Sequence, residues 1–248
     1  MAIKRNKMLN IKLTIMKNML LFLLFALILS SCSELDNYAE PDSRLTGEVI
    51  DIMTGEPLCT EQPQGFRIRY REISDKYPDA QNYYFWGKAD GTFNNSKMFA
   101  ATYEVTPVEG PFITPKSEII TVKGTATVRF EVIPYLVISA DKVEYSTETK
   151  VLHVKFKVSR PQGSNANPTF AFVALTWNPN VSYNTVGTTG SGLLSKKNIT
   201  SAELDDILSF DIDISSLTPN HTWYVRMGCG SDKNSSRFNY SNVHMFEY

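Results

Sequence analysis

Alternation of apolar and polar residues is the feature that most constrains the fold of this chain. Residues 66–71 alternate Phe, Ile and Tyr with three arginines, and the same period of two recurs in residues 126–132, 152–158 and 208–214. Successive side chains of a strand point to opposite faces, so the pattern predicts antiparallel strands with one buried and one solvated face. Helix-like sequence is confined to residues 201–207, with Ser201 as the expected N-cap. We therefore predict an all-β chain.

Many short strands with turn signals between them favour β-sandwiches. Pro134 removes a donor from a strand ladder, and a new strand pattern starts after it. We predict two consecutive antiparallel, immunoglobulin-like sandwiches, over residues 42–135 and 136–248. Asp90-Gly91 is expected to form a hairpin turn between strands 83–88 and 92–93, because glycine readily takes the positive φ of such turns.

The N-terminal segment has the composition of a secretory signal. Residues 1–31 hold five cationic residues and no acidic one, and they include eleven consecutive apolar residues at positions 19–29. A spanning helix needs about 20 apolar residues, whereas a short apolar run after cationic residues is typical of a signal peptide. The run ends Leu29-Ser30-Ser31-Cys32, which resembles the bacterial lipobox. We predict a lipoprotein signal peptide over residues 1–31 and lipidation of Cys32.

Residues 32–41 are expected to be a tether between the lipid and the first sandwich. The acidic residues Glu34 and Asp36 in this segment are similar to export signals of Bacteroidetes surface lipoproteins. This resemblance implies an outer-membrane protein that is lipid-anchored and faces the cell exterior. Two or more acyl chains hold a protein firmly to a bilayer.

Charge and cysteine content exclude some classes of protein. Without residues 1–31 the chain has 20 Lys and Arg against 26 Asp and Glu, a net charge near −6. No basic patch is evident, so we expect no nucleic-acid partner. Cys59 and Cys229 lie far apart and in different predicted sandwiches, so we expect two isolated thiols rather than a disulfide.

Several motifs resemble known domains. The sequences "LTGEVIDIMTGEPL" (45–58), "DGTF" (90–93) and "TYEVTP" (102–107) resemble the carboxypeptidase regulatory-like, transthyretin-like sandwich. "LTPNHTWYVRMG" (217–228) resembles the fibronectin type III pattern, with Trp223 in place of the tyrosine-corner residue, and residues 237–248 would form the last edge strand. With the lipobox, "EVIPYL" and "NYSNV", the whole chain after residue 31 resembles a Bacteroidetes lipoprotein family, domain of unknown function 3823. That resemblance implies a role beside SusC/SusD-type glycan importers and implies no catalytic residues.

Catalytic and metal motifs are absent from the sequence. No HExxH, CxxC, GxSxG or phosphate-binding loop occurs among the 248 residues. Asp211 and Asp213 share one strand face and could act as a glycosidase pair, but a solvated sheet face is the favoured interpretation. The arginines at 67, 69 and 71 also fit a solvated face, with pairing to acidic sugars as the alternative. We expect no enzyme activity, no catalytic residues, no metal and no cofactor.

Aromatic residues are the remaining signal for binding, because flat rings pack on the apolar faces of sugars while nearby polar groups bond the hydroxyls. "TWNPNVSYN" (176–184) is the favoured binding loop, and "NYYFWGK" (82–88) is a second stretch. Because one face of residues 83–86 must be core, the other pair of rings is expected to be exposed. The predicted glycan-binding residues are Trp177, Asn178, Asn180, Tyr183 and Asn184, with Tyr84 and Trp86.

These observations favour a non-catalytic surface lipoprotein that binds an oligosaccharide or polysaccharide for a SusC/SusD-type importer. The alternative is a structural or assembly partner, either a scaffold of the importer or a fimbrial-type subunit, with no glycan affinity of its own. Co-purification with the importer in the absence of sugar, formation of polymers without sugar, or a long exposed edge strand would favour that alternative.

Overall fold

A computed structural model of the protein describes residues 16–19, 40–76, 78–189 and 192–248. The chain divides into two units, residues 1–40 and 41–248. Residues 16–19 are helical, and Cys32, the lipobox and the tether up to residue 39 lie outside the described residues. Among the described segments, no helix has both the length and the apolar character needed to cross a bilayer.

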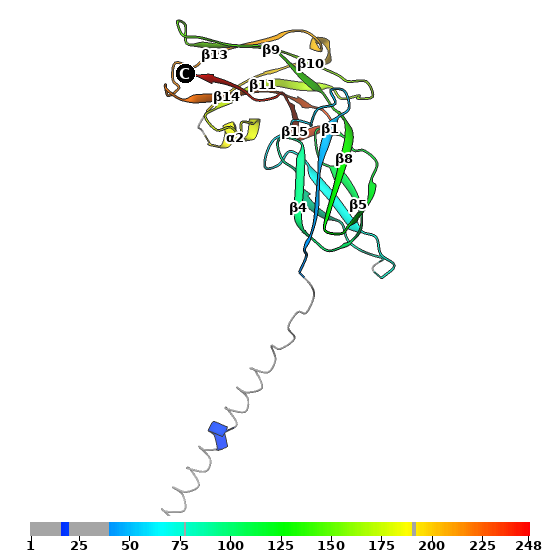
Figure 1. The fold of residues 1–248 in the computed structure, drawn as a ribbon. Coiled ribbons are helices and arrows are strands. Elements are labelled where there is room, and N and C mark those ends of the chain that lie inside the picture. Colours follow the sequence, from blue (N-terminus) through cyan, green and yellow to red (C-terminus); the bar gives the residue numbers. More distant parts are fainter. Residues whose placement is uncertain (1–15, 20–39, 77, 190–191) are drawn as a thin grey trace, which may run out of the picture. The chain divides into compact units, whose positions relative to one another are not determined.

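The first sandwich, residues 43–134, consists of two four-stranded sheets (Figure 1). One sheet has the order β4-β1-β8-β6, with strands Thr92–Met98, Ser43–Asp51, Thr125–Pro134 and Phe112–Ile113. The other has the order β3-β2-β5-β7, with strands Tyr83–Trp86, Arg67–Glu72, Ala101–Val108 and Glu118–Val122. Their facing sides bury one core, which includes Leu45, Val49, Phe66, Ile68, Phe93, Val105 and Phe130. The predicted alternation is confirmed in β8, where Val128, Phe130 and Val132 are buried and the residues between them are exposed.

Two pairings in this sandwich differ from expectation. The expected hairpin around Asp90-Gly91 is wrong, because β3 pairs with β2 in one sheet and β4 pairs with β1 in the other. Gly91 does take a positive φ of 77°, but the turn, in which the Lys88 amide donates to the Thr92 carbonyl, carries the chain between sheets. In addition, β1 and β8 are parallel, in a fold whose other paired strands are antiparallel throughout the described residues.

The second sandwich, residues 137–247, also has two sheets. The first has the order β13-β10-β9, with strands Leu208–Asp213, Val151–Ser159 and Val137–Ser146. The second has the order β12-β11-β14-β15, with strands Gly192–Asn198, Pro168–Thr176, Thr222–Ser231 and Asn234–Tyr240, and β16 (His244–Glu247) also pairs with β14. The core between these sheets includes Leu152, Phe156, Val173, Ile212 and Trp223. The predicted edge strand at 237–248 is therefore present in two pieces.

Trp223 shows how this sandwich replaces the tyrosine corner. Its side chain is buried, as its position in the fibronectin-like pattern predicts. Its indole Nε1 donates to the Thr218 carbonyl at 3.3 Å. The ring thus makes a backbone bond five residues upstream although the hydroxyl is missing.

The second sheet of this sandwich is covered on its other face as well. Helix α2 (Tyr183–Thr189) lies against that face (Figure 1), and a separate cluster forms there from Phe172, Ala174, Val181, Val186, Phe238 and Tyr240. Helix α2 was not predicted, because Gly187 and three threonines give residues 183–189 weak helical propensity. Reciprocal bonds between Ser182 and Thr185 fix its first turn.

The predicted helical stretch at 201–207 is only a short 3₁₀ turn, η1, over Ser201–Glu203. Its N-cap is Thr200 and not Ser201, because the Thr200 side chain accepts from Ala202 N while Glu203 accepts from the Thr200 amide. Thr200 and Glu203 thus form a capping box, and the N-cap lies one residue before the predicted one.

Candidate functional site

Arg226 joins the two sandwiches at their junction. It belongs to β14, whose other residues around it are apolar and buried, and its own side chain is 3% exposed. Its Nη1 donates to the Thr60 carbonyl of the first sandwich at 2.7 Å, and its Nε donates to the Ser241 carbonyl at 2.9 Å. Its guanidinium lies 4.4 Å from the centre of the Tyr240 ring. Because a buried charge needs such partners, Arg226 fixes the loop around Thr60 against the second sandwich.

Glu61 is a buried carboxylate at the same junction. Its oxygens accept from the Tyr240 hydroxyl at 2.9 Å and from Asn184 Nδ2 at 2.8 and 2.9 Å. Burial raises the pKa of the Glu61 carboxyl, against the opposing effect of these hydrogen bonds. A carboxylate of the first sandwich is thus held by two donors of the second.

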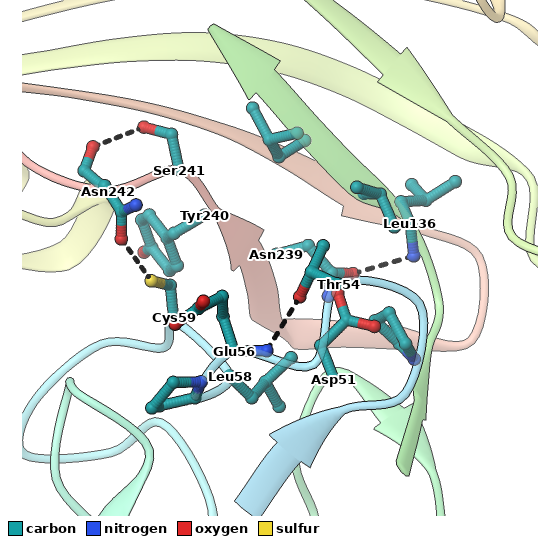
Figure 2. A pocket seen from close by; sticks show the side chains of 14 residues that line it. Asp51, Thr54, Glu56, Leu58, Cys59, Leu136, Asn239, Tyr240, Ser241 and Asn242 are labelled. Carbon is teal, nitrogen blue, oxygen red and sulfur yellow. Dashed lines mark hydrogen bonds between the residues drawn. The ribbon is translucent and has the colours of Figure 1, made fainter. Parts of the chain in front are cut away.

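A small pocket of about 140 Å³ lies beside these contacts (Figure 2). The Asn239 side chain makes two hydrogen bonds. Its Nδ2 donates to the Pro111 carbonyl at 2.9 Å, and its Oδ1 accepts from the Leu136 amide at 3.1 Å. Cys59 Sγ donates to Asn242 Oδ1 at 3.1 Å. Asn239 and Cys59 of this small pocket therefore help to hold the two sandwiches together. Cys59 and Cys229 are both free thiols, which confirms that prediction.

A larger hollow of about 770 Å³, called the junction cleft below, opens next to Glu61. Loop residues 61–64 of the first sandwich form one side of it. The second sandwich supplies three aromatic rings and several polar side chains: Phe170, Tyr183, Asn184, Thr185, Ser235, Ser236, Arg237 and Phe238. The cleft combines apolar rings with amide, hydroxyl and guanidinium groups, which is the composition of a small-molecule site.

Trp86 is next to the cleft because its ring contacts Arg237, which lines the cleft. The Arg237 guanidinium is 5.4 Å from the centre of the Trp86 ring, and the Arg67 guanidinium is 5.5 Å from it. Arg67 also lies 4.4 Å from the centre of the Tyr84 ring. Tyr84 and Trp86 share one face of β3, and both are exposed, whereas Phe85 packs on the core. Tyr83 is exposed as well. Of the expected buried pair, Tyr83 and Phe85, only Phe85 therefore packs on the core.

The predicted binding loop at 176–184 divides between two places. Tyr183 and Asn184 line the cleft. Tyr183 is the first residue of α2, and the Tyr183 ring packs on Phe172 and Phe238. Trp177 lies outside the cleft and is stacked on His221, with 5.8 Å between ring centres.

The two asparagines between them serve the loop itself. Asn178 Oδ1 accepts from the Asn180 amide at 2.9 Å, which closes a turn. Asn180 Nδ2 donates to the Gln62 carbonyl at 3.2 Å, across the junction. The loop therefore contributes Tyr183 and Asn184 to the cleft and Asn180 to the contact between the sandwiches.

Sequence reasoning missed Glu61, Arg237, Phe170 and Phe238. Glu61 and Arg237 are 176 positions apart and meet only through the junction. Arg226 carried a usable signal, since an arginine inside the apolar run of β14 must find buried partners.

A third hollow of about 340 Å³ lies in the first sandwich, lined by Tyr70, Glu72, Tyr83, Lys97, Met98, Phe99 and Tyr103. It is less than half the volume of the junction cleft. Across the described residues, no group of three or more His, Cys, Asp or Glu is placed to hold a metal ion.

Residues 43–133 match the family model for the N-terminal domain of DUF3823, proteins of unknown function. The first sandwich is a DUF3823 domain. A crystal structure of a DUF3823 family protein from Bacteroides uniformis superposes with a TM-score of 0.68 at 23% identity, covering 84% of this chain and 99% of that chain. One from Parabacteroides merdae has a TM-score of 0.66 at 19% identity, covering 84% and 100%. These similarities extend past residues 43–133, so both sandwiches of this chain have the fold of the two crystal structures.

A further crystal structure from Bacteroides uniformis is described as a candidate carbohydrate binding protein. It is 25% identical, with a TM-score of 0.66, and it covers 84% of this chain and 100% of that chain. No curated protein is significantly similar to this chain. The predicted all-β fold and the predicted resemblance to family 3823 are confirmed.

Proposed function

We propose that this protein is a non-catalytic carbohydrate-binding protein and that the junction cleft holds the sugar. The carrying observation is the lining of the cleft, in which the Tyr183, Phe170 and Phe238 rings lie beside amide, hydroxyl and guanidinium groups. Aromatic rings pack on the apolar faces of sugars, and the polar groups satisfy the hydroxyls. The similar structure described as a candidate carbohydrate binding protein supports the same ligand class.

The absence of catalysis is part of this proposal. Glycoside hydrolysis uses two carboxyl groups on either side of the bond that is cleaved. Glu61 is the one carboxylate among the described residues that line the cleft, and its oxygens are occupied by Tyr240 and Asn184. Asp211 and Asp213, the carboxylate pair considered in the sequence, are on β13 and do not line the cleft.

The cellular role that we propose rests on the sequence. Lipidation of Cys32 would anchor the protein to the outer membrane, facing the exterior, and the family resemblance suggests a SusC/SusD-type importer as its partner. A tethered binding domain raises the local concentration of its glycan near that importer without any chemistry of its own.

The test is binding of residues 41–248 to a panel of immobilised polysaccharides by affinity electrophoresis. This fragment contains all the described strands and both cores. We expect retardation by at least one glycan and its loss in Trp86→Ala, while Trp177→Ala, an exposed tryptophan outside the cleft, behaves as wild type. Binding to no glycan, together with co-purification with an importer in the absence of sugar, would instead establish a structural or assembly partner.

A further inference from the structure

Two arginines lie against one tryptophan beside the junction cleft, and Arg237 is the member of this group that lines the cleft. Arg67 comes from β2 of the first sandwich, and Arg237 comes from β15 of the second. Their guanidinium carbons lie 5.5 Å and 5.4 Å from the centre of the Trp86 ring. Two like charges are thus held at one ring by the junction of the two sandwiches, which favours a negatively charged partner between or beside them.

The two arginines differ in how far their charges are compensated. Arg67 forms an ion pair with Glu109. Arg237 has no carboxylate within ion-pair distance among the described residues, and its Nη1 donates only to the neighbouring Ser236 carbonyl. The Nε atoms of both arginines are buried and have no hydrogen-bond partner. A buried donor without a partner costs free energy, and a ligand oxygen would remove that cost.

Other charges around the cleft leave it positive at this end. Lys196 Nζ donates to the Tyr183 hydroxyl at 3.2 Å and lies 5.3 Å from the centre of the Phe170 ring. Glu61 is the carboxylate that lines the cleft, and it faces Tyr240 and Asn184, which already bond to it. Glu109 forms an ion pair with Arg67. Among the described residues, neither Arg237 nor Lys196 forms an ion pair. Arg237 acts on the buried Glu61 carboxyl, whose pKa burial raises and Arg237 lowers, without pairing with it.

We propose that the junction cleft selects an acidic glycan, with the carboxylate or sulfate of one sugar bound by Arg237 and a sugar ring packed against Trp86. This inference rests on the proposed function and specifies its ligand class. A guanidinium presents a planar fork of N–H donors that matches carboxylate and sulfate oxygens, and it keeps its charge at all physiological pH values. The ring face of Trp86 supplies the apolar surface for the sugar itself.

The experiment is calorimetric titration of residues 41–248 with matched pairs of oligosaccharides. Oligogalacturonate and its carboxyl-reduced neutral form differ only in the carboxylate, and a sulfated galactan oligosaccharide and its desulfated neutral form differ only in the sulfate. We expect at least one anionic member to bind about tenfold to a hundredfold more tightly than its partner. The affinity should also fall on going from low to high salt, because screening weakens exposed charge pairs. The two pairs separate a uronic acid ligand from a sulfated one.

The variants assign that preference to one side chain. Arg237→Gln should remove most of the preference for the anionic member, and Arg237→Lys should keep part of it by retaining the charge. Arg129→Gln removes a half-exposed arginine of β8, outside the cleft, and should bind as wild type. Melting temperatures of the three variants confirm that each is folded.

Three outcomes overturn the inference. If neutral members bind as tightly as anionic ones, and Trp86→Ala abolishes that binding, the protein binds glycans but not by charge, so the proposed function stands alone. An anionic preference that Arg237→Gln leaves intact would place the anion elsewhere. If no member of either pair or of the polysaccharide panel binds, the proposed function fails and this inference fails with it.

Discussion

The junction between the sandwiches carries two hollows of different character. In the small pocket of about 140 Å³, Asn239, Cys59 and Asn242 bond to groups of the protein itself. In the junction cleft of about 770 Å³, Arg237 has an Nε with no partner, and polar side chains line an open space. Polar groups at one junction can therefore have two tasks. Asn239 and Cys59 of the small pocket stabilise the contact between the sandwiches, whereas Arg237 of the cleft has a buried donor without a partner in the protein.

Arg226 should give the largest effect on stability, because it holds the junction on which both hollows depend. Arg226→Met removes the donors to the Thr60 and Ser241 carbonyls, which stay buried. We expect the free energy of unfolding to fall by about 3 kcal/mol. Urea unfolding followed by circular dichroism measures this loss. An unchanged midpoint would mean that Arg226 does not stabilise the junction.

Asn239 tests the small pocket alone. Asn239→Ala removes one donor to Pro111 and one acceptor for Leu136, so we expect a loss of about 2 kcal/mol. Binding at the cleft should stay near the wild-type affinity, because Asn239 does not line it. A variant of normal stability that had lost ligand affinity would reverse the roles assigned to the two hollows.

Glu61 makes a smaller, pH-dependent contribution. Burial raises the pKa of its carboxyl in the folded state above the ordinary value of 4.5, so the folded chain holds this proton more tightly than the unfolded chain. The stability from this group is complete below about pH 4.5 and is lost as the pH rises through the raised pKa. Glu61→Gln keeps an acceptor for Tyr240 and does not titrate. The free energy of unfolding of Glu61→Gln should therefore rise relative to that of the wild type as the pH increases from 4 to 7.

Thermal melts of both proteins across that range give the difference directly, since all other titrating groups are shared. A constant difference would show that Glu61 has the same pKa in both states. A difference that moves the other way would show that its hydrogen bonds outweigh burial.

The two exposed tryptophans should give the smallest change in stability. Trp86 is 40% exposed and Trp177 is 48% exposed, so we expect each alanine variant to lose about 1 kcal/mol or less by thermal melting. The pair sharpens the comparison because only Trp86 adjoins the cleft. A large loss of stability in Trp86→Ala would make this ring part of the junction rather than of a binding surface.

Much of the fold could be predicted from local pattern. Alternation in residues 152–158 and 208–214 identified strands whose inward residues are buried, because period two is a property of each strand by itself. Partner choice was not predictable in the same way. The turn at Gly91 has the expected conformation, but its flanking strands join different sheets, and the parallel pairing of β1 with β8 depends on residues 81 positions apart.

The candidate site was predicted in part for the same reason. Tyr183, Asn184 and Trp86 stand out in sequence because rings and amides cluster locally around them. Arg237 and Glu61 lie in ordinary polar stretches, and only the contact between the two sandwiches gives them a shared site. Trp177 has the same local signal as Trp86, yet it packs on His221 and Trp223, which no local pattern distinguishes.

A crystal structure of residues 41–248 with an oligosaccharide from the binding panel tests the central claim most directly. We predict that the sugar lies in the junction cleft, with one ring against Trp86 or Tyr183 and a polar group of the sugar within hydrogen-bond distance of Arg237. A sugar bound instead against Trp177, or in the hollow lined by Tyr70 and Phe99, with the cleft empty, would contradict the account.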